Sequence, residues 1–328
     1  MKICVIGCGS HSSFVHGPSY RKYAALHPDI HLAACCDLNL DAAKAYAQAF
    51  GFERTYTDFS EMIVRERPDM VGVVVPVALT CGIIQTVLRA GIPCLAEKPP
   101  ALTGEDAQHL ANVVKETAMP FRAAFNRRYT PLVRVIKTQL QNAEDPIQYI
   151  HYGMHRMGRN DADFSTTAIH GVDLVRYLAD APYASVRLAY DPIHNSGKEC
   201  FNIYLDGCME NGVRVRLDFL PLTGLVSECV GIQTNRRSYS LELPIGPHDA
   251  LGRLVTYENK ELVSSITSKD CPDGVEFYEA NGFYYEIASF LDQLRTGTSE
   301  TDGMPASYVQ SVALAEAIRL QKKKFGYK

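Results

Sequence analysis

Short, almost wholly apolar runs alternate with segments of helical periodicity in the first part of the chain. The runs span residues 3–6, 31–36, 70–75 and 93–96. Between them, residues 37–51 and 80–91 each form a periodic segment that stops at a glycine, which readily adopts the left-handed conformation that ends a helix. Parallel strands buried on both faces are apolar at nearly every position. Residues 1–125 are therefore predicted to form a Rossmann domain, a doubly wound parallel sheet.

The pattern changes after about residue 125. Several segments now alternate apolar and polar residues, as strands of an antiparallel sheet do when one face lies on a core. They are residues 146–156, 200–209, 212–222, 228–234, 237–244 and 254–266. Helical periodicity predicts helices over 165–180, 281–297 and 304–324, the last with Pro305 in its first turn. Residues 126–328 are predicted to form an α+β domain with a large, open, mostly antiparallel sheet.

Composition limits the partners that we expect. The 328 residues carry a net charge of −4, which gives no reason to expect a nucleic acid. The basic run 322–324 is expected in the last turn of the terminal helix, where cations oppose the helix dipole. No stretch approaches the roughly 18 apolar residues that span a bilayer. We therefore expect neither nucleic acid nor membrane as a partner.

Cysteine usage bears on location and on metals. Ten cysteines are scattered without a C-x-x-C pair, a pattern that suits reduced thiols better than a disulfide framework or a zinc site. The apolar run before Gly7 is too short for a signal peptide. We expect a cytoplasmic protein without a metal site.

A glycine-containing turn follows the first apolar run. It reads Gly7, Cys8, Gly9, Ser10, His11 and Ser12. In a dinucleotide-binding turn the first glycine permits the tight turn and the second lets the backbone approach the pyrophosphate, whose charge is held by N–H groups at the helix start. Ser12 stands where Gly or Ala is usual. We expect it to pack closely, with its hydroxyl as a further donor to phosphate. The alternative is a plain strand-to-helix turn.

An acidic residue follows the second run. Asp37 lies thirty residues after Gly7, and the next residues are Leu38 and Asn39, not arginine. A carboxylate at this place accepts hydrogen bonds from ribose hydroxyls and repels a 2′-phosphate. The sequence therefore predicts NAD as cofactor, with NADP less favoured. The alternative is a solvated loop aspartate.

Residues 90–102, AGIPCLAEKPPAL, end a strand in Glu97-Lys98-Pro99 and resemble the hallmark of the Gfo/Idh/MocA family of NAD(P)-dependent oxidoreductases. Further segments resemble that family in the same order along essentially the whole chain. They are PDMVGVVVP, FNRRYTP, AIHGVDLVRYL, YYEIASFLDQLRTGT and ASYVQSVALAEAI. The resemblance implies an NAD-binding domain followed by a domain whose sheet walls the substrate cleft. It places Val75, Pro76, Glu97 and Lys98 at the cofactor site.

The same resemblance implies which residues carry the chemistry. Lys98 corresponds to a lysine beside the nicotinamide and the reacting carbinol, where an ammonium stabilises an alkoxide. His170 corresponds to the proton acceptor, and an imidazole with a near-neutral pKa suits that task. The implied activity is hydride transfer between NAD and a secondary alcohol of a sugar, polyol or related hydroxylated molecule.

Two positions depart from the family pattern. An aspartate often stands four residues before the histidine, where this chain has Thr166, with Asp163 and Asp173 near it. A histidine often stands four residues after Pro76, where this chain has Thr80. Three outcomes stay open: dehydrogenation with the lysine and histidine alone, a redox-neutral step with retained NAD, or non-catalytic sensing of NAD or a sugar.

Several polar residues border the expected cleft and are candidate substrate contacts, with solvated surface as the alternative for each. They are Asn126, Arg128, His155, Arg156, Thr166 and Asp173, of which Asp173 also matches a family position that we interpret as structural. The open sheet is expected to pair subunits into a homodimer or homotetramer, because a large apolar face needs cover.

Overall fold

The computed structural model describes residues 1–143, 145–159, 163–194, 200–245, 251–271, 276–297 and 307–326. The chain forms two compact units: unit 1 is Met1–Asn126 with Phe277–Val312, and unit 2 is Arg127–Glu276 with Ala313–Lys328. The first boundary lies one residue beyond the expected one. The return of Phe277–Val312 to unit 1 is not visible in the sequence, because an amphipathic helix has the same periodicity whichever core it covers. Pro305 lies outside the described residues.

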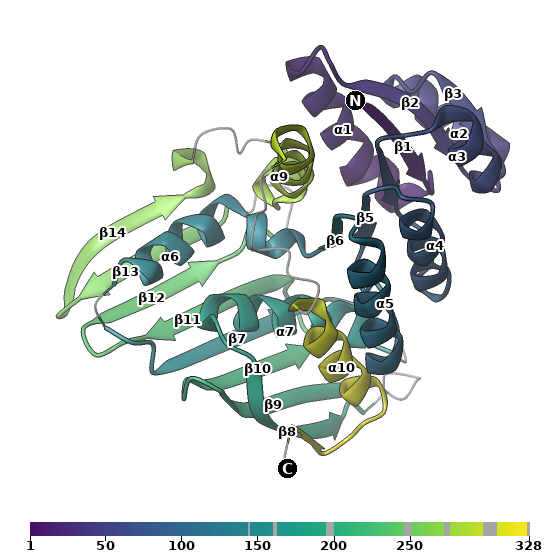
Figure 1. The fold of residues 1–328 in the computed structure, drawn as a ribbon. Helices are drawn as coiled ribbons and strands as arrows, with labels where there is room; N and C mark the ends of the chain where they lie inside the picture. The colour runs from purple at the N-terminus through teal and green to yellow at the C-terminus, as the bar shows by residue number, and fades with distance from the viewer. Residues whose placement is uncertain are drawn as a thin grey trace. The chain divides into compact units, whose positions relative to one another are not determined.

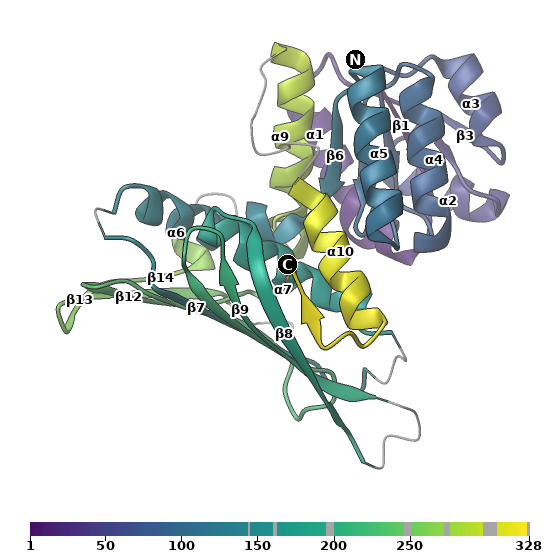
Figure 2. The same cartoon turned by 60° about the horizontal axis from the view of Figure 1, so that its bottom comes forward.

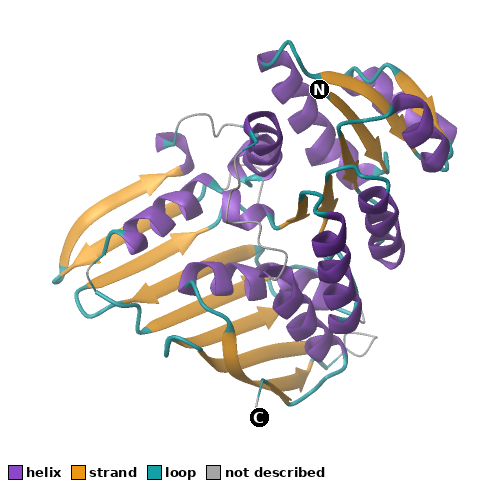
Figure 3. Ribbon diagram, viewed as in Figure 1, coloured by secondary structure: helices purple, strands orange, loops and turns teal. Residues whose placement is uncertain are grey.

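Unit 1 contains a six-stranded sheet in the order β3-β2-β1-β4-β5-β6, in which every neighbouring pair is parallel (Figures 1 and 3). The strands are β1 (Lys2–Ile6), β2 (His31–Cys36), β3 (Arg54–Tyr56), β4 (Met70–Val73), β5 (Cys94–Glu97) and β6 (Phe121–Ala124). All four apolar runs form strands, as predicted. The short strands β3 and β6 are additions that the apolar pattern does not indicate.

Helices cover both faces of this sheet. They are α1 (Gly17–Leu26), α2 (Leu40–Phe50), α3 (Phe59–Glu66), α4 (Val77–Arg89), α5 (Gly104–Thr117), α8 (Phe277–Ala280) and α9 (Phe283–Thr296). Tyrosines of α1 and α2 and apolar residues of α9 share one core with β1, β2 and β5, while α4 and α5 lie on the opposite face (Figure 2). The side chain of Asn39 caps α2, and Gly51 ends it at a φ of +86°, as the terminal glycine predicts.

Unit 2 is built on a nine-stranded sheet in the order β14-β13-β12-β11-β7-β10-β9-β8-β15. The strands are β7 (Tyr149–His155), β8 (Tyr183–Pro192), β9 (Phe201–Met209), β10 (Arg214–Leu220), β11 (Ser227–Gln233), β12 (Arg237–Glu242), β13 (Arg253–Glu258), β14 (Glu261–Thr267) and β15 (Lys324–Phe325). The β7–β10 pair is parallel and the other pairs are antiparallel. This is the mostly antiparallel sheet that the alternating pattern predicts.

Helices α6 (Pro131–Gln141) and α7 (Ser165–Ala179) cover one face of the sheet (Figure 2). The core there joins α6 and α7 to the strands and to the end of α10 (Ser307–Arg319). The basic run 322–324 was expected in the last turn of this helix, which is wrong. Gln321 has a φ of +50°, and the backbone of Lys324 in β15 is paired with that of Arg187 in β8 at the sheet edge. The helix therefore ends before the basic run.

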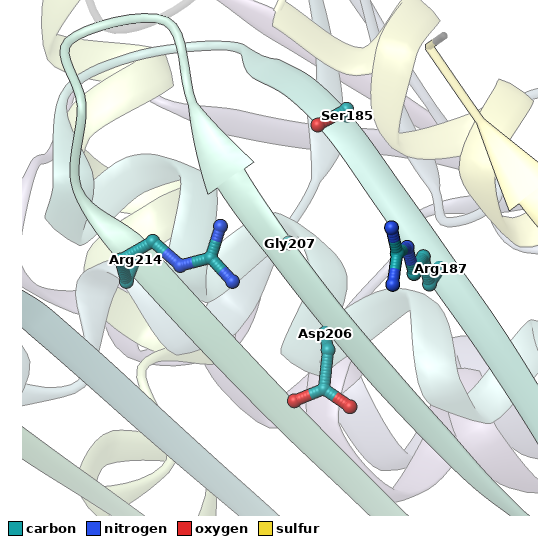
Figure 4. Close-up of a pocket in the computed structure, with 5 residues that line it drawn as sticks. All are labelled: Ser185, Arg187, Asp206, Gly207 and Arg214. Atoms are coloured by element: carbon teal, nitrogen blue, oxygen red, sulfur yellow. The ribbon is translucent and has the colours of Figure 1, made fainter.

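On β8, β9 and β10 the other face of the sheet carries charged side chains, whereas the expectation of subunit pairing assumed an apolar face. Arg216 lies 3.0 Å from Asp218 and 3.7 Å from Asp206. A pocket of about 390 Å³ on β8, β9 and β10 is lined by Ser185, Arg187, Asp206, Gly207 and Arg214 (Figure 4). On these three strands the face is therefore not the apolar surface that the expectation of pairing assumed.

Within the described residues, no helix is both long and apolar enough to cross a membrane.

Candidate functional site

The glycine turn connects β1 to the first helix of unit 1. Gly7 has a φ of +99°, and a Cβ built on it would lie 1.9 Å from the carbonyl oxygen of Val74. No other residue fits there without moving the backbone. Gly9 is exposed, and among the described residues no atom outside Gly9 and its two chain neighbours lies within 4 Å of the position of its would-be Cβ. The turn therefore combines a glycine required by the fold with a glycine that leaves open space above the backbone.

The helix after the turn starts with a π-helical turn, η1 (Ser12–His16), which runs directly into α1. The N–H of Gly17 donates to the carbonyl of Ser12, and the N–H of Ser13 donates to the carbonyl of Gly9 over 2.9 Å. A helix N-terminus behind an exposed glycine turn is suited to hold an anion. Ser10 and His11 are exposed at this N-terminus.

Ser12 and Cys8 hold the turn in place from inside. Ser12 is buried, and its Oγ donates to the hydroxyl of Tyr46 on α2 over 3.1 Å. The close packing expected of Ser12 is present, but the hydroxyl expected to reach a phosphate contacts α2 instead. A hydrogen bond with Cys35, together with burial, raises the pKa of Cys8. Cys8 therefore offers no thiolate to a ligand, and its backbone N–H is held by Asp37.

Asp37 lies at the carboxyl end of β2 and contacts the glycine turn. Its Oδ2 accepts a hydrogen bond from the N–H of Cys8 over 2.9 Å. Its Oδ1 accepts one from the N–H of Asn39, also over 2.9 Å. The carboxylate is half-buried, and each oxygen retains a lone pair for a ligand hydroxyl.

Glu97 ends β5 within a cluster of histidines. Its Oε1 lies 3.0 Å from Nε2 of His11 and 2.9 Å from Nε2 of His16. Its Oε2 accepts the N–H of Lys98 over 3.0 Å. Burial alone raises the pKa of Glu97, but the hydrogen bonds and charges of His11 and His16 outweigh it, so the pKa lies below its ordinary value. Sequence reasoning singled out Glu97 and His11 but missed His16, whose only signal is its spacing from His11.

The loop between β4 and α4 lies beside the same turn. The Cγ1 of Val75 lies 3.2 Å from the would-be Cβ of Gly7, and Pro76 begins α4 as its N-cap. Thr80 is buried, and its Oγ1 lies within hydrogen-bond distance of the carbonyls of Val75 and Pro76. Thr80 thus closes the start of α4.

Lys98 follows β5 directly and is partly exposed, and its peptide bond to Pro99 is cis. Unit 1 therefore brings together the glycine turn, Asp37, Val75, Pro76, Glu97 and Lys98 at the carboxyl end of its parallel strands. In doubly wound folds this end of the sheet is the ligand-binding end.

Most of the candidate substrate residues are engaged inside their own unit. Arg128 donates from Nε and from its terminal nitrogen to the two carboxylate oxygens of Asp173, over 2.7 and 2.5 Å, and both side chains are buried. Asn126 donates to the carbonyl of Asn281 over 2.8 Å in unit 1. These three side chains stabilise the fold around the places where substrate contacts were expected.

His155 and Arg156, at the end of β7, belong to a second network of side-chain contacts. Arg156 and Arg127 both bind the carboxylate of Glu228, which is buried. Burial raises the pKa of Glu228, but the two guanidinium groups outweigh this effect and lower it to about 2. His155 is half-buried, and its Nδ1 lies 2.8 Å from the hydroxyl of Ser227.

Helix α7 carries the histidine candidate. Thr166 and His170 are four residues apart in this helix and so lie on the same face. His170 is 8% exposed and Thr166 is half-buried. Asp163 accepts the N–H of Ser165 over 2.9 Å, so this carboxylate supports the start of α7.

The comparisons with known proteins agree with this geometry. Residues 1–125 match the family model GFO_IDH_MocA, described as "Oxidoreductase family, NAD-binding Rossmann fold". The chain is 27% identical over 142 residues to D-glucoside 3-dehydrogenase of Escherichia coli K12, covering 43% of this chain and 39% of the relative. It is 24% identical over 192 residues to D-apiose dehydrogenase of Paraburkholderia graminis, covering 54% and 49%. The chain thus spans half or less of these relatives' length.

Longer matches also exist. Inositol 2-dehydrogenase of Rhizobium meliloti is 25% identical over 328 residues, covering 92% of each chain. Among solved structures, levoglucosan dehydrogenase in complex with NADH has a TM-score of 0.82 at 17% identity, covering 99% of this chain and 98% of the other. UDP-N-acetylglucosamine 3-dehydrogenase of Acidithiobacillus ferrooxidans has a TM-score of 0.81 at 19% identity, covering 98% and 97%. These structures establish that the chain has their fold.

Proposed function

We propose that this chain, whose nucleotide-binding domain belongs to the Gfo/Idh/MocA oxidoreductase family, is an NAD-dependent dehydrogenase acting on a secondary alcohol of a sugar, polyol or related hydroxylated molecule. The observation that carries the proposal is the contrast between the two glycines of the turn. Gly7 has no room for a side chain, whereas Gly9 presents exposed backbone beside a helix N-terminus. This is the shape that a pyrophosphate needs.

The residues of unit 1 fit a dinucleotide. Backbone N–H groups of Gly9, Ser10 and His11 stand at the start of the helix, where a pyrophosphate would be held. Asp37 supplies the carboxylate for the adenosine ribose, and its charge favours NAD over NADP by repelling a 2′-phosphate. The support for NAD is this carboxylate and the absence of arginine in the two residues that follow it.

Bound NAD supplies the nicotinamide carbon that accepts or gives the hydride. The side chains that we assign to the reaction are Lys98, directly after β5, and His170 on α7. The Lys98 ammonium orients the alcohol oxygen and stabilises the negative charge that grows on it. His170 takes the alcohol proton as general base. Thr166 stands one helical turn before His170 and offers a hydroxyl where the family often has a carboxylate.

The substrate class is inferred from the relatives. Proteins named as glucoside, apiose and inositol dehydrogenases all match parts of this chain. A hydroxylated ring or chain is therefore the expected substrate.

Pairing of subunits through the open sheet of unit 2, as a homodimer or homotetramer, is part of the proposal. Its support is the mixture of Arg187, Asp206 and Arg214 on that face. Across a two-fold axis, positive groups of one copy can meet negative groups of the other. A strict monomer in light scattering at low salt would exclude it. A cytoplasmic location is supported by the ten cysteines, all among the described residues, which are free thiols.

The test is to mix the protein with NAD and, in turn, with inositols, glucosides and anhydrosugars, and to follow both NAD binding and absorbance of the reduced nicotinamide. A dehydrogenase binds NAD and reduces it with at least one compound. A protein that binds NAD but reduces none of it with any of these compounds is the sensor or the redox-neutral enzyme instead.

A further inference from the structure

Two histidines of unit 1 are brought onto one helix face by the π-helical turn. His11 and His16 are five residues apart, a spacing that does not align side chains in an α-helix, where positions three and four apart are neighbours. The π-helix η1 (Ser12–His16) joins residues five apart, as the hydrogen bond from Gly17 N–H to the Ser12 carbonyl shows. The ring centroids of His11 and His16 lie 5.7 Å apart. The π-helical turn thus places these two side chains on the same face, as an α-helix places two histidines four residues apart.

A third ligand group arrives from a different element. Glu97, at the end of β5, places Oε1 3.0 Å from Nε2 of His11 and 2.9 Å from Nε2 of His16. The three candidate ligand atoms, one from each residue, all lie within 4.8 Å of one another. Two imidazole nitrogens and one carboxylate oxygen therefore lie close together.

The surroundings fix these groups in place. The His16 ring is fully buried and packs between Tyr20 and Phe283, with centroids 6.4 and 6.2 Å away. The other carboxylate oxygen of Glu97, Oε2, accepts a hydrogen bond from the N–H of Lys98. The side chain of His11 is 51% exposed, so the cluster has one open side through which an ion and water can enter.

We propose that His11, His16 and Glu97 form a binding site for a divalent transition-metal ion, with Zn²⁺ as the expected occupant, bound through the two Nε2 atoms and Oε1. Two histidines and a glutamate are a ligand set of zinc sites that keep an open coordination position. Zinc bonds of about 2.0–2.2 Å in tetrahedral geometry put ligand atoms roughly 3.3–3.5 Å apart. The two histidine–glutamate separations therefore need to open by a few tenths of an ångström, and the two imidazole nitrogens, which lie within 4.8 Å of each other, need to reach the same range.

The chemistry of the groups is compatible with this site. Metal binding requires an ionised carboxylate and neutral imidazoles, and it releases any protons that the imidazoles share with Glu97. Water or a ligand oxygen would fill the remaining coordination position on the exposed side of His11. The inference does not rest on the dehydrogenase proposal, because it is argued from the geometry of the three side chains alone.

The test is a titration of the chelator-treated full chain with Zn²⁺ in a calorimeter, repeated with Co²⁺ while its visible absorption is followed. The proposal predicts one equivalent bound, with a Co²⁺ spectrum typical of nitrogen and oxygen ligands in fewer than six positions. The His11→Ala variant should weaken Zn²⁺ binding by at least about tenfold, because even residues that only support metal ligands are worth 10–100-fold.

The matched control is His109→Ala, which removes an exposed histidine from α5 of the same unit and should leave the affinity unchanged. His11 is half-exposed, so its removal should leave the melting temperature nearly unaltered. The proposed site would be overturned if the wild-type protein did not bind Zn²⁺, or if wild type and His11→Ala bound it with equal affinity. Glu97 would then only accept hydrogen bonds from the two histidines. NAD binding is measured on the same samples, so failure of the metal site is distinguished from failure of the cofactor site.

Discussion

The carboxylate of Asp37 accepts a hydrogen bond from the backbone N–H of Cys8 over 2.9 Å. This contact joins the end of β2 to the middle of the glycine turn, although the two residues are 29 positions apart in sequence. It fixes the negative charge expected to select the cofactor beside the backbone expected to hold the pyrophosphate. The charge expected to select the cofactor and the shape of the turn are therefore coupled through one side chain.

Replacing Asp37 with Asn should reduce the preference for NAD over NADP. The substitution keeps the side-chain shape but removes a charge that repels a 2′-phosphate. A repulsion of ~1.4 kcal/mol corresponds to about tenfold in relative affinity. Equilibrium titration with both nucleotides measures the ratio, and Asp41→Asn, an exposed aspartate in the first turn of α2, is the control. Equal affinities of the wild-type protein for NAD and NADP would contradict the assignment.

The two glycines of the turn should respond differently to alanine. Gly7→Ala puts a methyl group against the Val74 carbonyl at a positive φ and should lower the free energy of unfolding by more than ~1 kcal/mol. In Gly9→Ala the added methyl group enters open space, so the free energy of unfolding should change by less than ~0.5 kcal/mol. The affinity for NAD should fall about tenfold or more, because the methyl group keeps the pyrophosphate away from the backbone. Urea denaturation and nucleotide titration separate the two effects. Unchanged NAD affinity in Gly9→Ala would remove this turn from the cofactor site.

The fold was predictable where local pattern decides the outcome. The run 31–36 is apolar at five positions and forms β2 with the expected bounds, because a parallel strand must bury both faces. Gly51 ends α2 as its position predicts. Strand β3 has three residues, Arg54–Tyr56, and its partly exposed sequence carries no apolar signal. Its place is decided by pairing with β2.

The site was less predictable, because polar residues gain their roles from partners far along the chain. Arg128 and Asp173 were both considered as substrate contacts, but they meet each other across 45 positions. His16 escaped notice because its alignment with His11 depends on a π-helical turn, which the sequence does not distinguish from the start of an ordinary helix. Its contact with Glu97 spans 81 positions.

Breaking the Arg128–Asp173 pair should be costly. Both side chains are buried, so Arg128→Ala removes two charge-assisted hydrogen bonds from a buried carboxylate and should destabilise unit 2 by about 3–5 kcal/mol. The control is Arg236→Ala, which removes a half-exposed partner of Glu258 and should cost less than ~1 kcal/mol. Urea denaturation followed by circular dichroism measures both. A cost for Arg128→Ala no larger than that of Arg236→Ala would show that the pair does not stabilise the fold.

Unit 2 should lose stability in acid through Glu228. The pKa of this buried carboxyl lies near 2 in the folded chain and at its ordinary value of 4.5 when unfolded. Its contribution is therefore fully present above about pH 4.5 and is lost as the pH falls toward 2. Glu228→Gln should be destabilised at neutral pH and should show a flatter decline of stability between these pH values.

The matched control for this pH profile is Glu242→Gln, which changes an exposed carboxyl on the neighbouring strand β12. Melting temperatures measured from pH 2 to pH 7 should follow the wild-type curve in Glu242→Gln and depart from it in Glu228→Gln. A parallel decline in Glu228→Gln would mean that other carboxyl groups account for the acid sensitivity.

The most direct test of the proposed dehydrogenase is the rate of NAD reduction by the active compound in the wild-type protein, Lys98→Met and Lys115→Met. Methionine keeps the length of the lysine stem but removes the ammonium, and Lys115 is an exposed lysine on α5. We predict that Lys98→Met lowers kcat by about 100-fold or more while NAD affinity stays within a few-fold, and that Lys115→Met behaves as wild type. Equal kcat in Lys98→Met and wild type, or no NAD reduction by the wild-type protein with any of the compounds, would contradict the account.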